Sequence, residues 1–355
     1  MDLSVLIPTC ARPHKLSACI SALSRESLPK ERYEVLVGID GPENGELGAM
    51  GSVPSNFTIL SFPKAGVAAT RNRLLEHARG KFLLWLSESM IPNDQCLEAH
   101  LMAQGMAAAD GKGVMVMGAT PWIVHQPDRL FDKLIRERGV MCGGQVIRAS
   151  GNEANYDWGY RHAWTVNLSM PADAPRRLGG FVKQLSKGAY EDVELAWRLQ
   201  RWLGLPLHFN AEASAQHDRR YDPMDLLKHE AGIGFEAMQL AVLSPQCARE
   251  LFGRDVASPN EHRYTKGYIQ RDRGPAEQGL WTMLSLAHQP LQGMSVEDLR
   301  IKLDTLDEQT GVLRRWLWRR GLWSAQVGEP LSKLHEAIDD FVAEARKRRT
   351  GLRAA

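Results

Sequence analysis

The sequence predicts an α/β protein with a mostly parallel, doubly wound sheet, followed by a helical C-terminal region. Short, apolar, β-branched runs alternate with segments of helical periodicity over roughly the first 120 residues. Strands that alternate with helices at this spacing form parallel sheets. From residue 223 onward the apolar residues recur at helical spacing instead. The 355 residues are enough for one such domain with an added helical part.

The first half of the chain predicts five strands and three helices. Pro8 closes the first strand, a turn follows the strand that ends at Asp40, and Gly80 ends a helix. In chain order, the expected ranges are strand 3–8, helix 12–28, strands 33–40 and 57–62, helix 66–80, strand 81–89, helix 93–109 and strand 113–120.

Between residues 123 and 160 the pattern loosens, and we assign no element there. Further on, the pattern predicts a strand, a turn, a helix, a long helix and then a polar linker. Their ranges are 164–170, 177–182, 191–204, 223–243 and 258–277, and helices follow to the end.

Composition and charge indicate an ordinary soluble protein. The net charge of +2 gives no reason to expect a nucleic-acid partner. The five cysteines are scattered and form no CxxC pair, which predicts reduced thiols. The N-terminus lacks a signal-peptide pattern, and no apolar run is long enough to span a membrane. We therefore expect a cytoplasmic protein.

Several motifs, in this order and spacing, resemble the family 2 glycosyltransferases of GT-A fold. "VLIPTCARPHKL" is similar to that family's first strand and loop, and "VGIDGPENG" to its nucleotide-contacting turn. "KAGVAATRNRLLEHARGKFLLWLSES" resembles the stretch from the Gly-x-x-x-Ala-Arg-Asn element to the metal-binding acidic triplet. "WTVNLSM", "LGGFV", "YEDVELAWRLQRWLGLPLHF" and "ASAQH" resemble the acceptor half.

The resemblance covers about residues 3–217 and implies a domain organisation. A GT-A domain would span 1–245, with a nucleotide-binding half at 1–120 and an acceptor half at 121–245. Residues 246–355 would form a helical extension.

The implied activity is transfer of a sugar, with inversion, from a nucleotide-diphosphate sugar to a hydroxyl acceptor. The donor is expected to be a UDP-sugar and the acceptor a glycan or another hydroxyl compound, as in polysaccharide or glycan biosynthesis. Such a site must stabilise negative charge on the leaving diphosphate. It must also provide a base within hydrogen-bond reach of the acceptor hydroxyl.

Three acids stand at the start of the helix expected at 191–204. The resemblance makes Asp192 the general base and lets Glu191 orient the acceptor. The helix N-terminus favours a charged carboxylate, so Asp192 is expected to be ionised at neutral pH. The alternative is that Asp192 caps the helix. For Glu194 we expect a surface ion pair with Arg198, four residues on.

The resemblance also implies binding residues, and each has a structural alternative. Asp40 is equally a turn residue, Arg12 a surface residue, and the Gly179–Gly180 pair a simple turn. The candidates for the nucleotide sugar are Thr9, Arg12, Asp40, Arg71, Asn72 and Glu88, and those for the acceptor are Trp164, Asn167 and Gly180.

The chain departs from the family at the metal-binding triplet, where it carries Ser87-Glu88-Ser89. Serine hydroxyls are poor ligands for Mn²⁺ or Mg²⁺, which prefer carboxylates. Glu88 and His217 are the remaining candidate ligands, and they make a weak site.

Two hypotheses about catalysis follow. One is a working transferase whose leaving group is stabilised by cations or by an unusually held metal. The other is a catalytically inactive protein that binds a nucleotide sugar or a partner. The candidate cations are Lys64, Arg71, Arg219 and Arg220.

The segment "LRRWLWRRGLW" within residues 311–323 also has two interpretations. Its tryptophans and arginines are typical of a helix that lies on an anionic membrane, which predicts peripheral contact with the inner membrane face. Alternatively, the helix packs its tryptophans on the catalytic domain.

Overall fold

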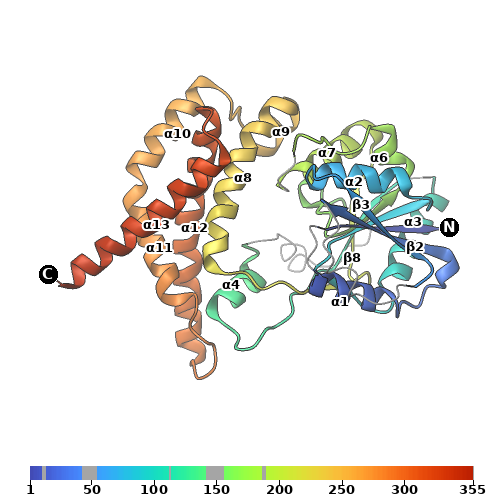
Figure 1. The fold of residues 1–355 in the computed structure, drawn as a ribbon, viewed down its shortest axis with the longest axis horizontal. Coiled ribbons are helices and arrows are strands. Elements are labelled where there is room, and N and C mark those ends of the chain that lie inside the picture. The colour runs from blue at the N-terminus through green and yellow to red at the C-terminus, as the bar shows by residue number, and fades with distance from the viewer. Residues whose placement is uncertain (10–12, 42–53, 112, 141–155, 186–188, 355) are drawn as a thin grey trace. The chain divides into compact units, whose positions relative to one another are not determined.

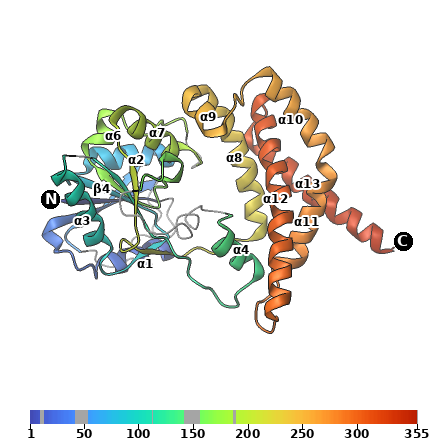
Figure 2. The same cartoon turned by 180° about the vertical axis from the view of Figure 1, so that it is seen from behind.

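The computed structural model describes residues 1–9, 13–41, 54–111, 113–140, 156–185 and 189–354. The chain forms two compact units (Figures 1 and 2). Unit 1 comprises Met1–Ile123 and Val146–Arg219, and unit 2 comprises Val124–Gln145 and Arg220–Ala355. α8 (Pro223–Leu243), which the expected division at residue 245 places in the first domain, packs on α12 (Val296–Gln326) of unit 2.

Unit 1 is built on a seven-stranded sheet in the order β3-β2-β1-β4-β7-β6-β8. All of these strands are parallel except β7, which is antiparallel to both β4 and β6. Their bounds are β1 Leu3–Thr9, β2 Tyr33–Asp40, β3 Phe57–Phe62, β4 Phe82–Leu86, β6 Met115–Gly118, β7 Asn167–Pro171 and β8 Leu207–Asn210. The expected mostly parallel sheet is confirmed.

Helices cover both faces of this sheet because the strand side chains alternate between two apolar clusters. In Figure 1, α2, α6 and α7 lie on one side of the strands and α1 on the other. Leu6 and Leu36 belong to the cluster under α2 and α7, whereas Val5 and Val35 belong to the cluster under α1 and α3. The bounds are α1 Pro13–Leu23, α2 Val67–His77, α3 Cys96–Ala109, α6 Asp173–Arg177 and α7 Glu191–Leu203.

The strand expected at 81–89 is shorter in the structure. β4 ends at Leu86, and Ser87 to Ser89 form a turn before β5 (Met90–Pro92). β5 pairs with β9 (Ala215–His217), so that Met90 lies opposite His217. This second sheet brings the end of the family-like region next to the serine turn.

Unit 2 is helical. Besides α8 and α12 it contains α4 (Leu130–Arg138), α9 (Pro245–Phe252), α10 (Pro259–Arg271), α11 (Arg273–Leu286) and α13 (Leu331–Ala354). The polar linker expected at 258–277 is wrong, because this stretch forms α10 and the start of α11. Ser258 caps α10 by accepting from the Glu261 N–H, and Thr265 is the helix's only buried residue. Because α10 buries so little, its sequence lacks the apolar stripe by which a helix is recognised, and the helix was not predicted.

The tryptophan-rich segment lies inside unit 2. Trp316 stacks on Phe341 at 4.5 Å between ring centroids and donates from Nε1 to the Ile269 carbonyl. Leu313 and Leu317 are fully buried. The apolar face that was expected to contact a membrane is therefore buried within unit 2, and its tryptophans pack on other helices of that unit. No helix in the described part of the chain is long and apolar enough to cross a membrane.

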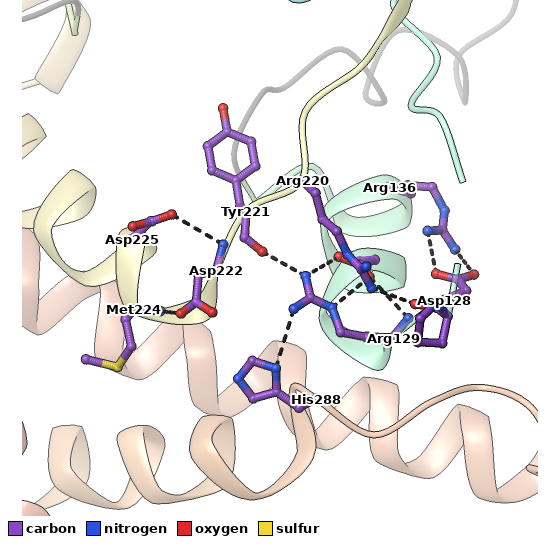
Figure 3. A network of polar contacts seen from close by, with 11 residues as sticks. Asp128, Arg129, Arg136, Arg220, Tyr221, Asp222, Met224, Asp225 and His288 are labelled. Carbon is purple, nitrogen blue, oxygen red and sulfur yellow. Dashed lines mark hydrogen bonds and ion pairs between the residues drawn. The ribbon is translucent and has the colours of Figure 1, made fainter. Parts of the chain in front are cut away.

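A polar network fixes the start of unit 2's longer segment (Figure 3). Arg129 and Arg220 both donate to the carboxylate of Asp132 on α4, and Arg129 also donates to the Tyr221 carbonyl. Asp132 is buried, and these hydrogen bonds and charges lower its pKa although burial opposes them. Arg220, a candidate cation for the leaving group, is thus engaged within unit 2.

Candidate active site

Asp192 lies in the first turn of α7 and keeps part of its surface open to solvent. Its carboxylate accepts from the backbone N–H of Val193 at 2.8 Å and of Thr165 at 3.3 Å. The amphipathic pattern of "VELAWRL" places α7, and its apolar side packs on the sheet. The packing of this helix therefore sets where the Asp192 carboxylate stands.

The Asp192 carboxyl is harder to ionise than expected. Burial and the neighbouring Glu191 raise its pKa to about 7, while Arg71 and the two N–H donors oppose the rise. The expectation of a fully ionised carboxylate is wrong, because desolvation and a like charge outweigh the helix terminus. At neutral pH the group is poised between its two forms, as suits an acid–base catalyst.

Glu191 forms a buried ion pair with Arg71 of α2. Oε1 of Glu191 is 2.5 Å from the Arg71 guanidinium, and both residues are at least nine-tenths buried. Oε2 of Glu191 and Nε of Arg71 are buried without a hydrogen-bond partner. The guanidinium also lies over the Phe181 ring. The structure thus brings together two candidates that the sequence analysis had placed in different subsites.

Glu194 and Arg198 form the expected pair, but inside the protein and not on its surface. They are 2% and 7% exposed, with N···O distances of 2.7 to 2.9 Å. Arg198 also donates to the carbonyls of Leu178 and Gly180. The Arg198 guanidinium therefore binds the turn at residues 178–180, and the ion pair is buried between this turn and α7.

Asn72 and Gly180 meet at the same turn. The Asn72 amide donates to the Phe181 carbonyl and accepts from the Phe181 N–H, at 2.9 and 2.8 Å. Gly180 has φ of +75°, and a Cβ there would lie 2.3 Å from Oδ1 of Asn72. A cavity of about 290 Å³ next to this turn is lined in part by Arg176 and Lys183. The Asn72 side chain therefore holds the backbone of the turn at Gly180 and Phe181 in place.

Asp40 is half-buried at the end of β2. Its carboxylate accepts from the N–H groups of Ala65 and Gly66, at 2.7 to 3.1 Å, directly before α2. The structure therefore gives Asp40 a role in fixing the loop between β3 and α2. Arg12, expected nearby, lies outside the described residues.

Thr9 and Glu88 pair with each other at the carboxyl ends of β1 and β4. The Thr9 hydroxyl donates to Oε2 of Glu88, and both residues are buried. The flanking serines contact each other, with 3.1 Å between Oγ of Ser87 and Oγ of Ser89. Among the described residues, no three His, Cys, Asp or Glu side chains are grouped so as to hold a metal ion. This donor set does not fit Mn²⁺ or Mg²⁺.

His217 is buried next to the serine turn, where its ring lies 4.0 Å from that of Trp122 between centroids. The following residue, Asp218, donates its N–H to the Ser89 carbonyl and is 2.8 Å from Nζ of Lys15 on α1. Neither Lys15 nor Asp218 was among the predicted site residues. No sequence signal links two such distant charges, and only the fold brings this cation to the turn.

The acceptor candidates differ in accessibility. Asn167 is fully buried, and its amide contacts His100 and the carbonyls of Ala119 and Ala213. It therefore ties strands together and is not available to an acceptor. Trp164 is half-buried and precedes Thr165, the Asp192 contact.

The serine turn and Asp192 lie at one edge of the sheet. The Ser87 N–H donates to the Val166 carbonyl at 3.1 Å, and the N–H of the preceding residue, Thr165, contacts Asp192. A carboxyl able to take a proton, a polar turn and the Lys15 ammonium thus gather outside the carboxyl ends of β1 and β4. Ligands of open α/β sheets bind at this edge.

Comparison with known proteins agrees with this arrangement. Residues 4–105 match the model of the glycosyl transferase family 2. Glycosyltransferase AglE of Haloferax volcanii is 27% identical over 254 residues, which is 70% of this chain and 77% of AglE. Residues 4–105 are therefore similar to the glycosyl transferase family 2. The mostly parallel sheet with helices on both faces is the expected α/β architecture, and the matched family and relatives are enzymes of glycosyl transfer.

A second relative and a solved structure are also similar. The validoxylamine A glucosyltransferase of Streptomyces hygroscopicus subsp. limoneus is 27% identical over 241 residues, or 62% of this chain. This match spans 53%, about half, of that relative's length. The crystal structure of residues 1–349 of S. aureus TarS superposes with a TM-score of 0.46 at 14% identity, with 92% of each chain covered.

Proposed function

We propose that this family 2 glycosyltransferase moves a sugar from a UDP-sugar to a hydroxyl acceptor, with inversion, and that Asp192 is the general base. The observation that carries the proposal is the position and acidity of Asp192. The residue is partly exposed at the ligand-binding edge of the sheet, and burial of its carboxyl, together with Glu191, raises the pKa to about 7. The environment suits removal of a proton near neutral pH.

In the proposed step, the acceptor oxygen bonds to the anomeric carbon as the bond from that carbon to the diphosphate oxygen breaks. The hydroxyl proton passes to Asp192, and the electron pair of the broken bond leaves with the diphosphate. Glu191 is buried beside Asp192, where its charge raises the pKa of the proposed base. Arg71 holds Glu191 in that position.

The proposed reaction uses no metal ion, because the oxygen atoms of Ser87, Glu88 and Ser89 do not suit Mn²⁺ or Mg²⁺ as ligands. Positive charge for the leaving diphosphate is assigned instead to Lys15. An ammonium has three N–H donors, and Asp218 anchors the Lys15 side chain beside the serine turn. Fixed donors aimed at developing charge stabilise a transition state. Arg71 is buried against Glu191 and Arg220 is paired with Asp132 of unit 2, whereas the Lys15 side chain stays 34% exposed beside its partner Asp218.

The test is release of free nucleotide diphosphate from a panel of UDP-, GDP- and dTDP-sugars, with Mn²⁺ or with EDTA. We expect release from a UDP-sugar in both conditions. Lys15→Met should slow it and weaken UDP binding, whereas Lys30→Met, which removes an exposed lysine just before the start of β2, should change neither. Release that requires Mn²⁺ would contradict the role of Lys15.

The second hypothesis, a catalytically inactive binding protein, makes a different prediction for the same panel. It is motivated by the two serines at the family's metal-binding positions. It predicts that UDP binds while no donor is turned over, with or without Mn²⁺. That outcome would replace the transferase proposal.

A further inference from the structure

Four aromatic side chains of unit 1 form a row that leads away from the candidate base. Successive ring centroids lie 4.9 Å apart from Tyr156 to Trp158, 6.3 Å from Trp158 to His162 and 5.6 Å from His162 to Trp164. Each ring meets the next edge to face. The row ends beside Thr165, whose N–H contacts Asp192. We call Tyr156, Trp158, His162 and Trp164 the aromatic row.

The backbone under the aromatic row is held on two sides. Asp157 accepts from the N–H groups of Gly159 and Leu207, which attaches the segment to β8. Gln200 of α7 donates to Asp157 at 2.7 Å and accepts from the Tyr160 N–H at 3.1 Å. The rings are therefore pre-positioned, and a ligand that binds there meets little ordering cost.

The rings are supported by the core without being enclosed by it. Trp158 and Trp164 pack against the apolar cluster between the sheet and α7, yet both keep part of their surface exposed. Tyr156 is 50% exposed. Burial and the nearby Arg161 lower the pKa of His162, so that its ring is neutral at pH 7. The row thus offers uncharged ring surface to solvent.

We propose that the aromatic row binds the acceptor, and that the acceptor is an oligosaccharide of at least two or three sugars and not a single small molecule. The inference rests on the proposed function, which places the acceptor hydroxyl at Asp192. Pyranose rings present flat C–H faces that stack on aromatic rings, while their hydroxyl groups stay in water. A row that extends from the base can contact sugars beyond the one that reacts.

Other flat or apolar ligands fit the row less well. Bases of single-stranded nucleic acid also stack on aromatic rings, but they require a groove lined with positive charge. The only charged side chains within residues 156–164 are Asp157 and Arg161, which have opposite signs. A row of aromatic rings without aliphatic neighbours in the same segment is likewise unsuited to a lipid chain.

The experiment measures binding of β-1,4-linked glucose, β-1,4-linked N-acetylglucosamine and α-1,4-linked glucose oligomers, one to six units long, by calorimetry in the presence of UDP. For at least one series we expect the dissociation constant to fall about fivefold with each added unit up to three, since one aromatic contact contributes on that order. Tyr156→Ala and Trp158→Phe should reduce this gain with length. Trp202→Ala, which removes an exposed tryptophan of α7 outside the row, should leave it unchanged.

The proposal is overturned if no series binds, if the monosaccharide binds as well as the trimer, or if both row variants keep the gain with length. A variant that melts below the wild type is replaced by Tyr156→Leu, which keeps bulk without an aromatic face. Release of UDP from the donor in the absence of any glycan tests the proposed function separately. A protein that hydrolyses the donor but shows no gain with length would refute the aromatic row alone.

Discussion

The acidity of Asp192 should be adjustable through the ion pair next to it. Burial raises the pKa of Asp192 most, Glu191 raises it further, and Arg71 lowers it. Glu191→Gln removes the like charge and leaves the guanidinium, so the pKa of Asp192 should fall. Arg71→Gln removes the positive charge and leaves the Glu191 carboxylate unpaired, so the pKa of Asp192 should rise. Opposite shifts from the two halves of one pair are the signature of this arrangement.

The size of each shift follows from the charges involved. A charge within a few ångströms moves a carboxyl pKa by about one to three units, and we take about one unit here. With a pKa of about 7, roughly a tenth of the Asp192 carboxyls are ionised at pH 6 in the wild type. A pKa near 6 in Glu191→Gln would make about half of them ionised. The rate at pH 6, relative to its plateau, should then rise about fivefold.

The assay is kcat/KM for donor turnover between pH 5 and pH 9, with the acidic limb fitted to one ionisation. Because the ionised form accepts the proton, the rate should increase through about pH 7 in the wild type. Glu76→Gln, which removes an exposed acid of α2, is the control and should not move the limb. A limb that stays in place in both pair variants would refute the coupling.

Stability needs to be checked in the same variants. Breaking a buried ion pair costs about 3 to 5 kcal/mol because the remaining charge is left uncompensated. The double variant, in which Arg71 and Glu191 are both replaced by Gln, should recover much of this loss and shift the limb less than either single change. Melting temperatures measured alongside the rates separate a displaced pKa from a partly unfolded enzyme.

Three further predictions concern the stability of the two units. Gly234→Ala should destabilise unit 2 by about 1 to 3 kcal/mol, because a Cβ there would lie 1.9 Å from a carbonyl oxygen of α12. Gly232→Ala, in the same helix with nothing within 4 Å, should instead be neutral or gain up to about 1 kcal/mol by calorimetry. Arg198→Met should lower the free energy of unfolding by about 3 kcal/mol in denaturant, since Glu194 would remain buried and unpaired, and a cost under about 1 kcal/mol would contradict this. Burial raises the pKa of Glu26 to about 8, so the folded state holds its proton above the unfolded value near 4.5 and stability should fall as the pH rises between those values. Glu26→Gln should flatten that fall in melting temperature, and an unchanged slope would show that another group causes it.

The sheet was predictable because its strands are continuous apolar runs bounded by turn residues. Tyr33–Asp40 and Phe57–Phe62 are confirmed at the expected residues, the first as a buried strand and the second as an edge strand in which only Phe57 is buried. α10 and the start of α11 were missed for the opposite reason. Their sequence is polar, and α10, with a single buried residue, is held by its cap and by polar contacts such as those from Trp316 and Arg319 of α12.

The individual acids of α7 could be located from the sequence, but their partners could not. The chain shows three carboxylates in one helical turn, and periodicity says only that Glu194 and Arg198 share a face. That Glu191 pairs with Arg71 depends on how α2 packs against α7, and that Lys15 meets Asp218 depends on the closure of the second sheet. Contacts of this kind appear only after the core has assembled.

The reversal at Asp192 has the same origin. A helix start on its own favours an ionised carboxylate. Burial of the α7 terminus and the position of Glu191 are tertiary features, and together they change the direction of the shift. The aromatic row was hidden for a related reason, because Tyr156 and Trp158 lie where the sequence shows no clear periodicity.

Replacement of the Asp192 carboxylate by an amide tests the proposed chemistry most directly. In Asp192→Asn we expect UDP to bind with a dissociation constant close to that of the wild type, while donor turnover falls at least a hundredfold, on the order expected for a lost general base. If Asp192→Asn turns over the donor at a rate near that of the wild type, a different group accepts the proton and the assignment of the base is wrong.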